Sequence, residues 1–300
     1  MTGYGNKMVG KILFLMSMIF IPLHPLLCQN GLGFLNMAAD ARNASLSGSD
    51  LVRGAGVNDM NFNPALLLNI QRNSLFLSHS EWMEMKNMGL GFARRLKPGV
   101  AGLYAAYQYD TSVIKTDIYG NDQGEMKVYN LIIKAGFARN FINKNSGAGM
   151  NIKYILSVLD EYKAQSVCAD IGGIYRPGWL KDRIGFGLGI LNLGLPLKYK
   201  DEKAGLPVTF QAGVSYQVLG LPEHRVFLYG SGCYNIHDLF TLPLGIEYNF
   251  FRIGYGRISY LLASENARSV SFGLGVIYKR FSVGAAYIPG AGADGIAYNI

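Results

Sequence analysis

The segment TFQAGVSYQV, residues Thr209–Val218, alternates strictly between two kinds of side chain. Successive side chains of a β-strand point to opposite faces, so the segment predicts a strand whose two faces differ. One face is apolar, and the other carries small or polar side chains. The apolar face holds Phe210, Ala212, Val214, Tyr216 and Val218, and the other holds Thr209, Gln211, Gly213, Ser215 and Gln217.

The same alternation recurs from residue 72 onward, in segments such as Tyr129–Phe137, Gly149–Ser157 and Gly185–Ile190. Sandwich strands usually have about five or six residues, whereas a strand that crosses a membrane needs about 9–11. In a transmembrane barrel the outward face meets lipid and the inward face is polar or small. We therefore expect lipid to contact Phe210, Val214 and Tyr216, and the lumen to be lined by Lys134, Lys153, Gln211 and Ser215.

Counting these segments predicts an antiparallel barrel of fourteen strands. Their expected ranges are 72–80, 86–96, 99–110, 127–141, 147–158, 164–176, 184–194, 207–218, 223–235, 240–250, 251–261, 268–278, 280–288 and 295–300. Short and longer connections alternate, as in outer-membrane barrels, which places the C-terminus on the periplasmic side. A soluble barrel or a two-layer sandwich is the alternative, but it leaves the many long strands with an apolar face unexplained.

Composition agrees with a membrane barrel. Only 16% of the 300 residues are charged, against about 25% in ordinary soluble domains, while 50% are hydrophobic and 38 are glycine. Such a chain buries ample apolar surface, which excludes a disordered protein. Three cysteines exclude a disulfide scaffold, and the glycine content argues against a helical soluble enzyme because glycine destabilises helix interiors by about 1 kcal/mol.

The first 28 residues resemble a secretory signal. Lys7 and Lys11 precede the apolar run Ile12–Ile21, which is too short to span a membrane as a helix. A membrane anchor or acylation at Cys28 are the alternatives. We divide the chain into a signal peptide (1–28), an N-terminal segment (29–70) and a barrel (71–300).

The N-terminal segment lacks the two-residue period. Small side chains dominate 38–48, and Asn63-Pro64-Ala65 predicts a turn because proline fixes φ and asparagine bonds nearby backbone. About 40 residues without an apolar stripe rarely fold alone. We expect the segment to pack inside the barrel, against glycine-rich walls.

Several motifs in the chain resemble the PorV/PorQ family of FadL-like outer-membrane proteins. They are Phe34-Leu35, Ala41-Arg42-Asn43-Ala44 followed by Gly48, Asn63-Pro64-Ala65, Ser78–Trp82, Asp170–Tyr175, Leu191–Gly194, Leu206-Pro207, Phe272–Gly275 and Ala286–Pro289. The resemblance implies a fourteen-stranded barrel in the outer membrane of Bacteroidota-type bacteria, with an N-terminal hatch in the lumen. The hatch residues that it implies are Ala41, Arg42, Gly48, Asn63, Pro64 and Ala65.

Catalytic, metal and nucleic-acid sites are not expected. Ser78 and Ser80 face away from His79 in a strand, so no triad forms there. His224 and His237 have no cysteine or carboxylate partners at ligand spacing. The net charge of +8 comes from scattered residues, which suits contact with anionic lipopolysaccharide better than nucleic acid. No glycine loop precedes a helix, so we expect no nucleotide cofactor.

Two functions stay open. The resemblance implies help with protein export or surface attachment in a type IX secretion system, with secretion proteins or cargo as partners. Its working surface would be the loops 111–126 and 195–207. The alternative is a FadL-like channel for hydrophobic small molecules, gated at Asn63-Pro64-Ala65. The polar and small inward face favours the interaction role, because a channel should have an apolar lining.

Overall fold

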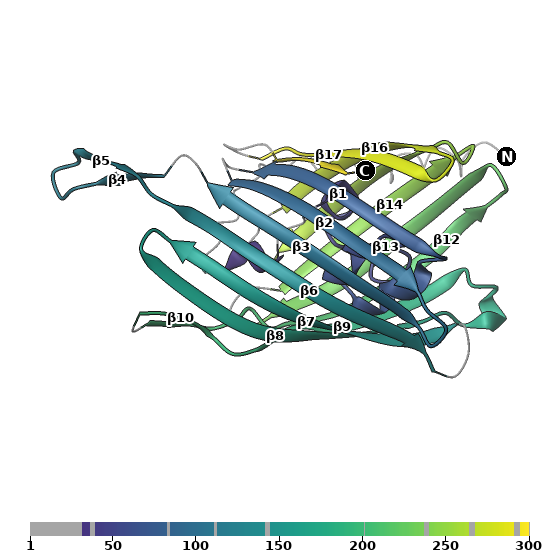
Figure 1. Ribbon diagram of the computed structural model, residues 1–300. Coiled ribbons are helices and arrows are strands. Elements are labelled where there is room, and N and C mark those ends of the chain that lie inside the picture. Colours follow the sequence, from purple (N-terminus) through teal and green to yellow (C-terminus); the bar gives the residue numbers. More distant parts are fainter. Residues whose placement is uncertain are drawn as a thin grey trace.

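The structure is a computed structural model that describes residues 32–36, 40–82, 85–110, 113–141, 145–200, 202–236, 240–263, 268–290 and 295–299. The expected signal peptide lies outside the described residues. Fourteen strands form a closed antiparallel barrel, in the order β1-β18-β17-β16-β15-β14-β13-β12-β9-β8-β7-β6-β3-β2 (Figure 1). The predicted fold class and strand number are therefore confirmed.

The barrel strands match the expected ranges closely. They are β1 (Asn73–Trp82), β2 (Met85–Arg95), β3 (Val100–Asp110), β6 (Val128–Asn140), β7 (Ser146–Leu159), β8 (Tyr162–Tyr175), β9 (Ile184–Gly194), β12 (Thr209–Gly220), β13 (His224–Asn235), β14 (Phe240–Phe250), β15 (Gly254–Ala263), β16 (Arg268–Tyr278), β17 (Phe281–Ile288) and β18 (Gly295–Asn299). Closure joins the first strand to the last, from the pair Ser78 and Asn299 to the pair Trp82 and Gly295.

One turn differs from the expectation. The sequence placed a new strand from Phe251, but a turn occupies Phe251–Ile253 and β15 begins at Gly254. Phe251 and Arg252 have φ values of 50° and 59° in the left-handed region. Glycine or asparagine usually marks such positions, so an aromatic residue and an arginine hide the turn in the sequence.

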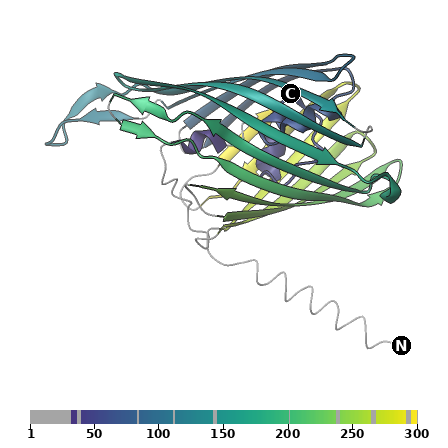
Figure 2. The same ribbon diagram turned by 90° about the horizontal axis from the view of Figure 1, so that it is seen from below.

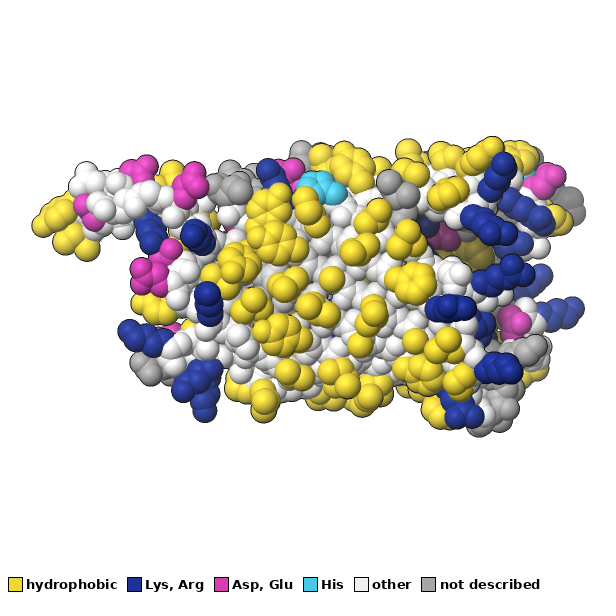
Figure 3. Space-filling model, in the orientation of Figure 1, with side chains coloured by type: hydrophobic (Ala, Val, Ile, Leu, Met, Phe, Trp, Pro, Cys, Tyr) yellow, Lys and Arg dark blue, Asp and Glu magenta, His cyan; other side chains and the backbone are white. Residues whose placement is uncertain are grey.

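The outward face of the barrel is apolar. Phe210, Val214 and Tyr216 are exposed there, while Gln211 and Ser215 are buried on the inward face. Hydrophobic side chains cover the middle of the visible face, and Lys and Arg side chains gather toward the ends (Figure 3). An apolar band around the middle of a strand barrel is the surface that contacts lipid in transmembrane barrels. Among the described residues, no helix is long and apolar enough to cross a membrane.

Aromatic side chains mark both ends of this apolar band. Tyr107 lies against Tyr109 and Tyr129, with ring centroids 5.4 and 5.9 Å away, near one end of the barrel. At the other end His224 bonds the hydroxyl of Tyr248 at 2.8 Å. Aromatic girdles of this kind flank the lipid-facing band of outer-membrane barrels.

The two ends of the barrel differ in their connections. One end, the short-turn end, carries tight turns such as Phe251–Ile253, and the other, the long-loop end, carries two hairpins that the sequence did not predict. These are β4 (Ile114–Thr116) with β5 (Asp122–Glu125), and β10 (Leu197–Tyr199) with β11 (Glu202–Ala204). The β4–β5 hairpin projects away from the barrel (Figures 1 and 2).

The described residues 32–36 and 40–70, called the inner segment below, lie within the barrel (Figures 1 and 2). The inner segment forms short helices: η1 (Gly33–Asn36), α2 (Ala41–Ser45), η2 (Val57–Asn61) and η3 (Pro64–Asn69). A further short helix, η4 (Gly178–Leu180), lies at the short-turn end. Asp40 caps α2 by accepting a hydrogen bond from the Asn43 N–H, and Asn63 caps η3 through the Ala65 N–H.

Candidate functional site

Inward-facing glycines bring the wall into direct contact with the inner segment. A Cβ atom added at Gly149 of β7 would lie 2.6 Å from the Pro64 carbonyl carbon, and one at Gly172 of β8 would overlap the Asn63 side chain. No side chain fits at either position without displacing backbone or a capping group. Glycine in these strands therefore serves close approach of the wall to Asn63-Pro64-Ala65.

The Asn63 side chain forms hydrogen bonds both within the inner segment and to the barrel wall. Its amide nitrogen donates to the Leu51 carbonyl at 2.9 Å and to the Gly173 carbonyl at 3.2 Å. Its carbonyl oxygen accepts from the Ala65 N–H at 3.0 Å. The turn predicted at Asn63-Pro64 is present, and proline occupies the first position of η3, where its missing N–H costs nothing.

A buried ionic cluster connects α2 to the opposite wall. Arg42 Nη2 lies 2.6 Å from Asp50 Oδ2 and 3.5 Å from Glu247 Oε2, and Arg42 Nη1 lies 3.6 Å from Asp59 Oδ1. Arg257 of β15 donates to the same Glu247 carboxylate at 2.7 Å. Removing one member of a buried ion pair costs about 3–5 kcal/mol, because its partner stays charged without compensation.

Burial and neighbouring charges shift the pKa values of two members of this cluster, Asp59 and Arg42. Burial raises the pKa of Asp59 to about 6, and Arg42 opposes that effect only in part. For Arg42 the balance is different. Burial lowers its pKa, but Asp50, Glu247 and Asp59 outweigh burial and hold the pKa well above the ordinary value. Arg42 is therefore a permanent cation among three carboxyl groups.

A second polar group lies on strands β6 to β9. Lys153 Nζ lies 2.6 Å from Asp170 Oδ1 and also bonds Asn192. The Asn192 N–H donates to Asp170 at 2.9 Å, at a point where the β8–β9 register shifts. Lys134 Nζ donates to Asn61 Oδ1 of the inner segment at 2.6 Å. This group contains buried charge of both signs, which its partners compensate.

One apolar cluster extends along the inside of the barrel, from Val100 and Ala138 near the short-turn end to Leu197 at the long-loop end, and its part in the long-loop half is called the apolar zone below. It joins inward side chains of the wall to the inner segment and to the loop between β9 and β12. Its buried members include Leu32, Phe34, Ile132, Ile155, Leu197 and Leu206. Tyr199 of the same loop donates to Ser157 at 2.6 Å, which holds the β10–β11 hairpin against the wall. The inward face was expected to be mostly small or polar, and Ile132 and Ile155 are apolar exceptions that are buried on that face.

Six sequence-predicted residues lie in the inner segment, and four lie on the wall. Lys134, Gln211 and Ser215 each contact the inner segment: Gln211 donates to the Phe62 carbonyl, and Ser215 accepts from Arg53 Nε at 3.0 Å. Lys153 instead bonds wall residues. Ala41 is buried in α2, and Gly48 accepts from Ser231 at 3.3 Å through its carbonyl.

Sequence reasoning missed Asp50, Asp59, Glu247 and Arg257. Glu247 and Arg257 occupy inward positions of strands whose alternation was recognised, so a charged residue there was the available signal. No comparable pattern marks Asp50 or Asp59. In the described part of the chain, no group of three or more His, Cys, Asp or Glu side chains is placed to hold a metal ion.

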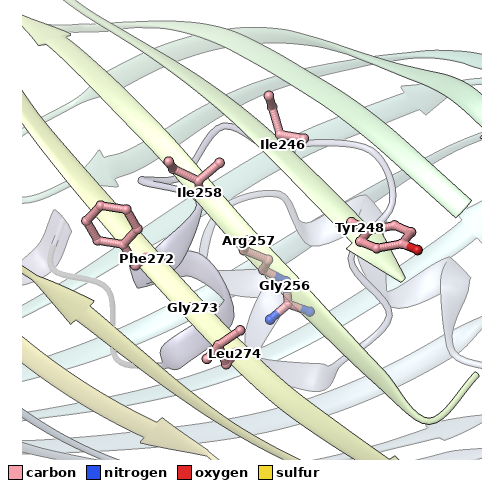
Figure 4. Close-up of a pocket in the computed structure, with 8 residues that line it drawn as sticks. All are labelled: Ile246, Tyr248, Gly256, Arg257, Ile258, Phe272, Gly273 and Leu274. Carbon is pink, nitrogen blue, oxygen red and sulfur yellow. The ribbon is translucent and has the colours of Figure 1, made fainter. Parts of the chain in front are cut away.

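A shallow depression lies on the outward face, away from the lumen. It measures about 370 Å³ and spans β14 to β16, where Gly256 lies between Tyr248 and Leu274 in register (Figure 4). Ile246, Ile258 and Phe272 also line it. Because it opens on the apolar band, it belongs to the lipid-facing surface and not to the site inside the barrel.

The fold is that of FadL-type outer-membrane transporters. The toluene transporter TodX of Pseudomonas putida matches 88% of this chain and 96% of its own, with a TM-score of 0.65 and 10% identity. The Ralstonia pickettii toluene transporter TbuX covers 88% and 98%, with a TM-score of 0.61 and 13% identity. A Pseudomonas aeruginosa FadL homologue covers 93% and 97%, with a TM-score of 0.56 and 9% identity.

No family model and no curated protein matches the sequence. At identities of 13% and below, the structural likeness establishes the architecture of the barrel alone.

Proposed function

We propose that the chain lies in the outer membrane and passes hydrophobic small molecules through its barrel, with the inner segment as the hatch. The observation that carries the proposal is the apolar zone inside a barrel of the FadL type. Its members come from the wall, the inner segment and the long-loop end together. Transfer of a hydrophobic solute from water to such a lining lowers its free energy.

Part of the apolar zone comes from segments that are not strands of the barrel wall. Phe34 and Leu32 reach it from the inner segment, and Leu197 and Leu206 reach it from a loop, so neither set belongs to the hydrogen-bonded wall. Their displacement leaves the strand pairing of the barrel intact. The polar residues Lys134 and Lys153 lie two residues from Ile132 and Ile155 along β6 and β7, toward the short-turn end.

Uptake measurements test the proposal. Cells that lack hydrophobic-compound porins are supplied with the full chain, and entry of labelled toluene is compared with entry of a small sugar. We expect faster entry of toluene alone. Ile155→Asn should lower that entry about tenfold. Toluene in the apolar zone would leave the new amide without a hydrogen-bond partner, which costs about 1–3 kcal/mol. Ile155→Leu, which conserves volume and polarity, should retain it.

The outcome that contradicts the proposal is toluene entry no faster than in cells without the chain, although the barrel is inserted. Heat-modifiable mobility on gels checks insertion for each variant. Equal entry by Ile155→Asn and Ile155→Leu would show that the apolar zone takes no part in passage.

Help with protein export, which the resemblance to PorV and PorQ implies, stays a second prediction. Its support is the set of sequence motifs around Ala41-Arg42 and Asn63-Pro64-Ala65, and an origin in Bacteroidota rests on the same motifs. The wall that surrounds these motifs has the architecture of the toluene transporters. Passage of hydrophobic molecules therefore has the broader support.

A further inference from the structure

The β4–β5 hairpin extends beyond the other loops along the barrel axis in both ribbon views (Figures 1 and 2). Ile118 and Tyr119 lie between its strands, at the tip, and are 91% and 83% exposed. Hydrophobic atoms stand at the far end of the projection in Figure 3. The hairpin therefore carries a large aliphatic and an aromatic side chain into water, away from the apolar band that meets lipid.

The tip has a fixed conformation. Asp117 accepts hydrogen bonds from the Tyr119 and Asn121 backbone N–H groups, at 2.8 and 2.9 Å, and from the Asn121 side chain at 2.9 Å. Gly120 supplies the positive φ of 84° that the turn needs. A tip that is ordered before binding loses little conformational entropy on binding, so its apolar contacts yield more net affinity.

The base of the hairpin is anchored to the barrel. The Met126 N–H donates to the Val113 carbonyl at 2.8 Å, and this hydrogen bond joins the two ends of the hairpin at its base. Lys115 Nζ lies 2.5 Å from Asp160 Oδ2 in the turn between β7 and β8. These contacts hold the tip at a set position relative to the end of the barrel.

The charge of the hairpin restricts the partner. Asp117 and Asp122 flank the tip and Glu125 lies opposite Ile114 at the base, while the lysine of the hairpin, Lys115, is paired with Asp160. The hairpin is thus acidic on a chain whose net charge is +8. An anionic lipopolysaccharide surface repels such a tip, whereas a surface rich in Lys or Arg attracts it.

We propose that the β4–β5 hairpin is a docking element for a protein outside the membrane, which receives Ile118 and Tyr119 in an apolar pocket with a basic rim. Aromatic anchors in a pocket, surrounded by complementary charge, are the usual centre of a protein interface. This interaction is separate from the passage of small molecules and does not depend on it.

Photocrosslinking in cells that express the chain natively tests this proposal. The photoreactive residue p-benzoylphenylalanine replaces Tyr119 in the full chain. We expect one protein adduct of discrete mass, with the crosslinked peptide next to Lys or Arg residues. Ile118→Asp should reduce the adduct at least about tenfold, as for a residue at the centre of an interface. Asp122→Lys combined with Glu125→Lys should reduce it as well.

Ile114→Asp is the matched control, because Ile114 is an exposed isoleucine at the base of the same hairpin. It should leave the adduct unchanged. The proposal is overturned by no adduct, by an adduct of two copies of this chain, by an adduct with lipopolysaccharide, or by a protein adduct that Ile118→Asp does not reduce. Heat-modifiable mobility verifies that each variant forms the barrel.

Discussion

Arg42 of α2 and Glu247 of β14 form an ion pair of 3.5 Å across the boundary between the inner segment and the barrel wall, although 205 residues separate them in the sequence. Arg257 holds the same carboxylate from the neighbouring strand. The Glu247 carboxylate therefore lies between two cations, one from the segment and one from the wall.

Glu247→Gln should loosen the inner segment while leaving the barrel closed. The change removes the charge that separates Arg42 from Arg257, and loss of one buried partner costs about 3–5 kcal/mol. Hydrogen–deuterium exchange of residues 40–50 should become faster. Glu125→Gln, at an exposed hairpin position, is the control and should leave that exchange unchanged. Equal exchange in both variants would mean that the pair does not hold the segment.

Gly149→Ala should displace the Asn63-Pro64-Ala65 turn, since the added Cβ would lie 2.6 Å from Pro64 backbone. Overpacking of this kind costs about 1–3 kcal/mol. Gly173→Ala is a matched control on the adjoining strand, because its nearest neighbour, the Gly147 carbonyl oxygen, lies 3.7 Å away. Limited proteolysis of the inner segment should distinguish them, and equal protection would contradict the close contact.

Asp59 should make the attachment of the inner segment depend on pH. Its pKa of about 6 in the folded chain exceeds the ordinary 3.8, because burial outweighs Arg42, with Asp40 and Asp50 also nearby. Between these values the folded chain keeps a proton that the unfolded chain has released. The stabilising contribution of the protonated group is therefore present below pH 3.8 and is lost as the pH rises through 6. Asp59→Asn should remove this part of the pH dependence of exchange in residues 40–62. An identical pH profile would contradict it.

Arginine scanning along β12 should reveal the depth of each outward position. Val214→Arg, in the middle of the strand, should cost about 2–4 kcal/mol of folding free energy in lipid, and Leu219→Arg, near its end, about 0–1. Both residues are exposed, and the register shift between Gln217 and Leu219 places Leu219 opposite Val226. Reversible unfolding in lipid vesicles measures the two values. Equal costs would mean that β12 does not cross the membrane along its length.

Much of the barrel could be predicted from the sequence, because alternating apolar and polar side chains indicate which face of a strand points outward. Val214 and Gln211 illustrate this: their alternation is enough to assign the outward and inward faces. The turn at Phe251–Ile253 could not be predicted, because its left-handed residues are not the glycine or asparagine that usually marks them. The β4–β5 hairpin was expected only as a long loop.

The inner site was less accessible to sequence reasoning. Asn63-Pro64-Ala65 was recognisable as a turn, yet its bonds to Leu51 and Gly173 depend on which strand lies opposite. The pair between Arg42 and Glu247 likewise requires closure of the barrel, which brings distant segments together. Ile132 and Ile155 stand among polar inward residues, so their common apolar zone emerges only when the loop with Leu197 folds over them.

We propose that the inner segment, and not the barrel wall, closes the lumen. Single-channel conductance of the full chain, compared with a variant that lacks residues 32–70, tests this directly. The strand pairing that closes the barrel involves none of the deleted residues, so the variant should still insert and show heat-modifiable mobility. We predict a severalfold larger conductance for the deletion. Unchanged conductance through an inserted barrel would show that the inner segment does not close the lumen.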